Sequence, residues 1–166
     1  MALPVTVLLA LVLHRPPPAT VTPGSVSGSG RPAALGPVQV SPPPPSAVAT
    51  RDCPAVISHL PGSLAGQPAR EARSSSPYVA SWGDPPLILR CGVPRPAGFT
   101  GGSELSVING VQWLPTQHGA DTVWTAVDRG AYVELTIPGG HTGTAVVELS
   151  AALSQALPAR PLDPAK

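Results

Sequence analysis

The segment TVWTAVDRGAYVELTI, residues 122–137, carries the clearest secondary-structure signal in this chain of 166 residues. Its last six residues, YVELTI, alternate between polar and apolar side chains, as in a strand with one buried and one solvent-facing side. Residues 122–127 are also rich in β-forming side chains, and Asp128-Arg129-Gly130 lies between the two runs. This spacing is typical of a three-residue hairpin loop with Gly130 in the left-handed conformation. The segment therefore predicts two antiparallel strands, 122–127 and 131–137.

Two stretches upstream predict further strands. LILRC at residues 87–91 is an apolar run with prolines only at its entrance, which favours a buried strand. SVINGVQW at residues 106–113 places Asn109-Gly110 between two apolar pairs. Asn-Gly is a strong hairpin signal, because both central positions of the turn need a positive φ.

A helix is predicted on each side of these strands. Residues 52–60, DCPAVISHL, have Asp52 or Cys53 at the N-cap position and Pro54 in the first turn. Residues 144–157 carry apolar side chains at helical spacing and stop before Pro158. The predicted fold class is α+β: a small, mainly antiparallel sheet of about four strands, with a short N-terminal helix and a C-terminal amphipathic helix.

Composition separates the folded part from the rest. Residues 1–50 contain no acidic residue, no aromatic residue and no cysteine, so we expect the folded domain at 52–158 and a flexible tail at 159–166. Residues 14–50 hold proline runs and a Gly/Ser run, which predict a spacer. With ten basic residues, nine acidic residues and a net charge of +1, the chain has no electrostatic footprint for nucleic acid.

Residues 1–13 include the most apolar run of the chain, ALPVTVLLALVL at 2–13. A helix of that length spans only ~18 Å, against ~30 Å for the hydrocarbon core of a bilayer. Three interpretations are open: part of a longer membrane anchor whose true start lies upstream, a short leader, or a buried core strand. The first two predict a cell-membrane location, single-pass or leader-exported, with the folded domain outside the cytoplasm.

The only two cysteines, Cys53 and Cys91, predict a disulfide bond. Two cysteines behind a hydrophobic leader favour an oxidising compartment. Closing a loop of about 38 residues stabilises a fold by ~3–4 kcal/mol in the chain-entropy model. The alternative is two separate buried thiols in a cytosolic protein.

The chain contains no recognisable motif for a metal, a cofactor or a catalytic nucleophile. Its four histidines are scattered, and its cysteines lack zinc-site spacing, so we expect no catalytic residue, cofactor or metal. Trp82 and Trp113 form a possible binding surface for a sugar or a peptide, although core packing is the commoner role of tryptophan. A hydrolase would have to gather Asp84, Glu104 or His118 in one cleft.

The block WGDPPLILRCGVPRP at residues 82–96, with Cys53-Pro54 upstream and NGVQW at 109–113 downstream, resembles an actinobacterial family known as domain of unknown function 3515. The resemblance covers about 52–158. It implies a short, membrane-anchored, exported envelope protein, and it supplies no activity, cofactor or catalytic residue.

We therefore expect a non-enzymatic, membrane-tethered extracytoplasmic domain with a binding role in the cell envelope. Its expected partner is an envelope protein or a cell-wall component, held through one face of the sheet, with membrane attachment through the N-terminal segment. Two alternatives are an envelope hydrolase with an unrecognised site and a structural subunit of a membrane complex.

Overall fold

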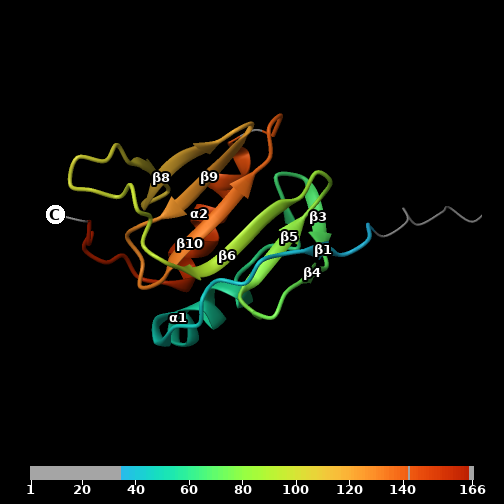
Figure 1. The fold of residues 1–166 in the computed structure, drawn as a ribbon, viewed down its shortest axis with the longest axis horizontal. Helices are drawn as coiled ribbons and strands as arrows, with labels where there is room; N and C mark the ends of the chain where they lie inside the picture. The colour runs from blue at the N-terminus through green and yellow to red at the C-terminus, as the bar shows by residue number, and fades with distance from the viewer. Residues whose placement is uncertain (1–34, 142, 165–166) are drawn as a thin grey trace, which may run out of the picture. The chain divides into compact units, whose positions relative to one another are not determined.

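The computed structural model describes residues 35–141 and 143–164, which form an antiparallel sheet with two helices (Figure 1). The apolar run at 2–13 and most of the predicted spacer lie outside the described residues. In chain order the elements are β1 (Val38–Gln39), α1 (Ala47–Ser58), β2 (Ser63–Leu64), β3 (Gln67–Arg70), β4 (Ala72–Arg73), β5 (Val79–Trp82), β6 (Leu87–Val93), β7 (Ser106–Ile108), β8 (Val111–His118), β9 (Asp121–Ala126), β10 (Tyr132–Ile137) and α2 (Thr144–Ala156).

The sheet has eight strands in the order β2-β3-β5-β6-β10-β9-β8-β7, and every neighbouring pair is antiparallel. The α+β class, the antiparallel sheet and the C-terminal helix are confirmed. The predicted count of about four strands is wrong. Strands β2 and β3 are short and show no regular alternation, and they gain their place by pairing in series onto β5. A separate pair, β1 and β4, is parallel.

Strand β8 runs past Pro115, a residue that lacks the backbone N–H of a ladder donor. Its neighbour β7 pairs only with the first part of β8, opposite Ser106–Ile108. Beyond that point β8 is an edge strand with β9 as its one partner, so Pro115 can face Trp124 without breaking a second ladder. The hairpin at Asn109-Gly110 is confirmed, with φ values of 48° and 75° at these two residues.

The β9–β10 hairpin is confirmed as well, with Leu135 paired to Trp124, but the predicted conformation of its loop is wrong. Gly130 does not have a positive φ. A Cβ atom at Gly130 would overlap Oδ2 of Asp52, so glycine is needed there because α1 comes close to the loop. The requirement for glycine at position 130 therefore comes from the packing of α1 against the loop, and not from the local geometry of the turn.

The folded part also begins earlier than residue 52. Ser46 caps α1 by accepting a hydrogen bond from the N–H of Ala49 at 3.0 Å, and Pro54 lies inside the helix and not in its first turn. Upstream, the N–H of Val40 donates to Arg73 at 2.9 Å, which ties this part of the predicted spacer to β4. At the other end, Arg160 in the predicted tail donates its N–H to Asp128 at 2.7 Å.

One face of the sheet is closed by the helices and the other is open. In Figure 1, α2 lies behind β9 and β10. The main core lies between the helices and this face of the sheet, and its residues are almost completely buried. They include Ala49, Cys53 and Val56 on α1, Leu87, Leu89 and Cys91 on β6, Val133, Leu135 and Ile137 on β10, and Val146, Leu149 and Leu153 on α2. Among residues 35–141 and 143–164, neither helix has the length and apolarity to cross a membrane.

Candidate functional site

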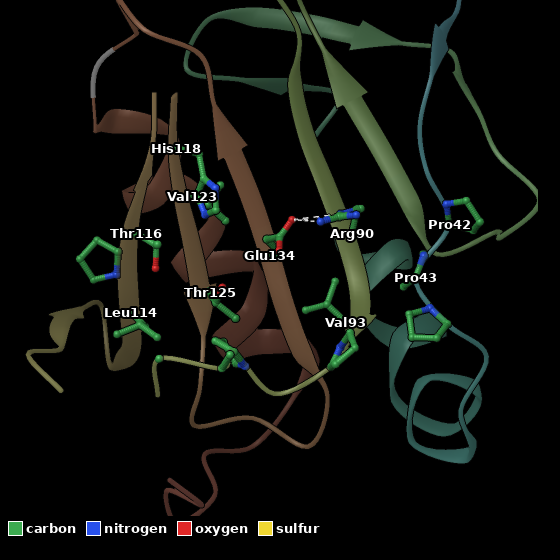
Figure 2. A pocket seen from close by; sticks show the side chains of 16 residues that line it. Pro42, Pro43, Arg90, Val93, Leu114, Thr116, His118, Val123, Thr125 and Glu134 are labelled. Atoms are coloured by element: carbon green, nitrogen blue, oxygen red, sulfur yellow. Dashed lines mark hydrogen bonds and ion pairs between the residues drawn. The ribbon is translucent and has the colours of Figure 1, made fainter. Parts of the chain in front are cut away.

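The open face of the sheet carries a groove of about 530 Å³, within the range of small-ligand sites. Figure 2 shows its floor, where side chains of β6, β10, β9 and β8 lie next to one another. The register sets this order, because Arg90 pairs with Glu134, Glu134 with Thr125, and Thr125 with Leu114. These four residues form one row across the sheet.

Strand alternation explains why polar groups reach this face. On β6, Leu89 is fully buried on the closed face, so Arg90 must point to the open face. On β10, Leu135 is fully buried in the same way, and Glu134 points beside Arg90. The same pattern that predicted the strands therefore also places a cation and an anion side by side.

Arg90 and Glu134 form the central interaction of the groove. Nε of Arg90 donates to Oε1 of Glu134 at 3.0 Å, and Nη2 of Arg90 donates to the same oxygen. The side chains are 32% and 14% exposed, so the pair is accessible from the groove without being fully solvated. Among the contacts within the described part of the chain, Nη1 of Arg90 and Oε2 of Glu134 take part in no hydrogen bond.

Prolines form the walls of the groove. Pro42, Pro43 and Pro44 lie on one side, on the segment between β1 and α1, and Pro94 and Pro96 follow the end of β6. In Figure 2, Pro42 and Pro43 lie beyond β6, and Thr116 lies across the floor from them on β8. The fixed φ of proline makes these walls stiff, and they offer no backbone N–H to a ligand.

A small apolar cluster holds the loop that follows β6. Phe99, 1% exposed, packs with Leu114 and Val127, and Leu105 and Tyr132 lie against them. Burial raises the pKa of the Tyr132 phenol above its usual value, and the nearby Asp163 carboxylate adds to the shift. This cluster anchors the groove wall to the open face of the sheet.

The structure contradicts the predicted binding surface at Trp82 and Trp113. Both side chains are buried in the main core, 1% and 0% exposed, and neither can stack on a ligand. Trp82 donates its indole N–H to the carbonyl of Pro61 at 3.0 Å. Trp113 donates to Oγ of Ser150 on α2 at 2.8 Å. Each polar end of these large side chains thus has an internal partner, as buried tryptophan requires.

The predicted disulfide is present. Cys53 on α1 and Cys91 on β6 are bonded, with Cα atoms 5.7 Å apart, and both are completely buried. The bond lies in the core on the closed face, so it fixes α1 against β6 and contributes no atom to the groove.

The three residues named for a hydrolase are not brought together. His118 lines the groove near the end of β8 (Figure 2). Asp84 lies elsewhere and accepts a hydrogen bond from Nη1 of Arg70 at 3.0 Å. Glu104 is exposed on the loop before β7 and does not line the groove. Within residues 35–141 and 143–164, no three His, Cys, Asp or Glu side chains are grouped as metal ligands.

A second charged cluster lies around the β9–β10 loop, outside the groove. Asp128 and Arg129 form an ion pair at 2.8 Å with both side chains only 3% exposed. Arg129 also donates to the carbonyl of Gly110 at 3.0 Å, which links the two hairpin loops. Asp52 approaches Gly130 from α1, and the hydrogen bond from Arg51 lowers the pKa of the Asp52 carboxyl. These contacts join the two hairpin loops to each other and place α1 against the β9–β10 loop.

The structure defines an α+β protein with a helix-covered sheet whose free face carries a groove. The chain belongs to the family described as "Protein of unknown function (DUF3515)", whose model matches residues 2–162. No curated protein and no solved structure matches the chain.

Proposed function

We propose that the folded part of this protein is an extracytoplasmic binding domain, tethered to the cell membrane by its N-terminal segment, that holds an envelope protein or a wall component in the open-face groove. The observation that carries the proposal is the groove itself. It lies on the face of the sheet that the helices do not cover, and a partly exposed Arg90–Glu134 pair occupies its floor.

The disulfide supports the proposed location. Disulfides persist in oxidising compartments and are rare in the cytosol, and this one is buried between a helix and a central strand. The apolar run at residues 2–13 supports membrane attachment.

The groups that line the groove support binding as the role. They offer a cation, an anion, hydroxyl groups of Thr116 and Thr125, and an apolar surface. Such a mixture of apolar walls and a few polar groups is typical of recognition sites. The hydrolase alternative would need a base and a nucleophile to converge, and of its three named residues only His118 reaches this groove.

The location is tested by two reporter fusions at the C-terminus of the full chain. Alkaline phosphatase folds only after export, and β-galactosidase is active only in the cytoplasm. We expect an active phosphatase fusion and an inactive galactosidase fusion. The reverse pattern would remove the extracytoplasmic assignment.

Binding in the groove is tested by photocrosslinking in intact cells. Thr116 and Gln117 are consecutive exposed residues of β8 that point to opposite faces, so they form a matched pair. A small aliphatic diazirine amino acid at position 116, which leaves room for a ligand, should give a defined adduct, and the same group at position 117 should not. Equal labelling from both positions, or none from position 116, would contradict the proposed function.

A further inference from the structure

We propose that the groove binds an extended, uncharged, aliphatic peptide segment of a partner protein, and that the Arg90–Glu134 pair recognises the backbone N–H and C=O of one residue of that segment. This inference rests on the proposed function and adds the chemical class of the ligand.

The dimensions of the groove suit a short extended peptide. Its floor crosses from β6 to β8, which is three inter-strand steps of about 4.8 Å, or roughly 14 Å. An extended chain rises about 3.3 Å per residue, so this width corresponds to about four residues. The backbone groups of β10 and β9 already pair with strands on both sides, so the centre of the floor, where Arg90 and Glu134 lie, recognises a ligand through side chains and not by strand addition.

The lining favours aliphatic side chains over sugars. The described lining residues include prolines from three segments together with Val93, Leu114 and Val123, and none of Phe, Tyr or Trp. A glycan would find no Phe, Tyr or Trp ring among these lining residues to stack on, whereas small aliphatic side chains can bury apolar area against prolines.

The charges of the groove compensate each other. Arg90 and Glu134 neutralise one another, and His118 is the one other titratable side chain among the described lining residues. A polyanion would need an excess of cations, which the groove does not offer. An uncharged ligand avoids breaking the pair.

The unused atoms of the pair match the backbone of one extended residue. Nη1 of Arg90 is a donor and Oε2 of Glu134 is an acceptor, and both remain available while the remaining atoms hold the pair together. In an extended chain the N–H and the C=O of one residue point to the same side, so they can meet the carboxylate and the guanidinium together. Both hydrogen bonds are assisted by a charge on the protein, which makes them stronger than hydrogen bonds between neutral groups.

The test uses the full chain and a blocked pentapeptide, acetyl-Ala-Val-Ala-Leu-Ala-amide, followed by calorimetry and amide NMR shifts. A second probe replaces one central peptide bond at a time by an ester, which removes an N–H donor and keeps the shape. We expect saturable binding of the amide probe, with shifts at Thr116 and Thr125. One ester position should weaken binding about tenfold, the size of one charge-assisted hydrogen bond.

Variants locate the effect. Thr116→Trp fills the groove and should abolish binding, whereas Gln117→Trp on the other face should not change it. In the double variant Arg90→Gln/Glu134→Gln the amide and ester probes should differ by less than about twofold. The matched control Arg70→Gln/Asp84→Asn removes an ion pair outside the groove and should keep the full amide–ester difference.

The outcomes separate this inference from the proposed function. If neither the pentapeptide nor its esters bind the wild-type chain while the adduct from position 116 persists, the ligand class is wrong and the binding role stands. If a trimer of N-acetylglucosamine binds and protects position 116, the ligand is a glycan and the peptide proposal is overturned. If the adduct is also absent, both proposals fail. The amide–ester comparison on the wild-type chain needs no variant, so it does not depend on any substitution being tolerated.

Discussion

The two faces of the sheet use the same strands for different purposes. On β6 and β10, Leu89 and Leu135 are fully buried against the helices, while Arg90 and Glu134, one residue away on each strand, meet in the groove. The closed face buries large apolar side chains and a disulfide, which supply most of the free energy of folding. The open face is free to carry polar groups, because the closed face already stabilises the strands. The groups of the proposed recognition site and the stabilising core therefore lie a single residue apart along each strand.

The largest effect should come from breaking the closed face at Trp113. Truncating a buried tryptophan to alanine typically costs about 3–5 kcal/mol, and Trp113→Ala would also leave the Ser150 hydroxyl without its indole donor. Chemical unfolding should show this loss. Thr116→Ala on the open face of the same strand is the control and should change stability by less than about 0.5 kcal/mol. Similar losses for the two variants would refute the division between the faces.

Removing the disulfide should have the next largest effect. It closes a loop with a sequence separation of 38, and the chain-entropy model gives a stabilisation of about 3–4 kcal/mol. The double variant Cys53→Ala/Cys91→Ala should lose that amount in denaturant unfolding. A reducing agent should lower the unfolding midpoint of the wild-type protein and leave that of the double variant unchanged. If the unfolding midpoint of the fully reduced wild-type protein equals that of the oxidised protein, the disulfide does not stabilise the fold as expected.

Parts of the fold with a regular period could be predicted from the sequence. Alternation in residues 131–137, the Asn109-Gly110 turn and the apolar spacing of α2 each encode local structure within a few residues. Strands β2 and β3 carry no such pattern, and β8 continues beyond the predicted segment 106–113. These strands form because they pair with other strands of the sheet. A local sequence pattern contains no information about such pairing.

The candidate site shows the same limit. Alternation placed Glu134 on the solvent-facing side of its strand, but nothing local shows that β6 is its neighbour 44 residues away in sequence. The interpretation of Trp82 and Trp113 as a binding surface was wrong because residue type does not tell which face a strand buries. The proline walls were missed because residues 42–44 have the composition of a spacer. The one available signal was a single charged residue inside each of two predicted strands, with opposite signs of charge.

The contact between α1 and the β9–β10 loop can be broken at Gly130. A side chain there meets Asp52, so Gly130→Ala should cost about 1–3 kcal/mol, as overpacking does. Gly130→Asn should do no better, because the backbone of Gly130 is not left-handed. In an Asp52→Ala background the cost of Gly130→Ala should shrink markedly in a double-mutant cycle. An unchanged cost in that background would show that the strain lies elsewhere.

A smaller, pH-dependent effect is expected from Asp52 itself. The hydrogen bond from Arg51 lowers the pKa of the Asp52 carboxyl in the folded protein, against about 3.9 in an unfolded chain. Its stabilising contribution is therefore complete above about pH 5 and is lost as the pH falls through the folded-state pKa, below about 4. The melting temperatures of the wild-type protein and of Asp52→Asn should differ at pH 6 and converge toward pH 3. A constant difference over this range would contradict the assignment.

The smallest effect on stability should come from the open face. Partly exposed ion pairs contribute between zero and about 1 kcal/mol, because desolvation and side-chain ordering offset their attraction. Replacing both partners, in Arg90→Gln/Glu134→Gln, avoids leaving one charge alone; it keeps the size of the side chain at position 134 and shortens the one at position 90. We therefore expect an unfolding free energy within about 1 kcal/mol of wild type, together with the loss of the amide–ester difference in binding. Either single variant should be less stable than the double, because it leaves an unpaired charge, 14% exposed in the case of Glu134. If the double variant proved as destabilised as Trp113→Ala, the pair would belong to the framework of the fold, and the separation of recognition from stability across this sheet would not hold.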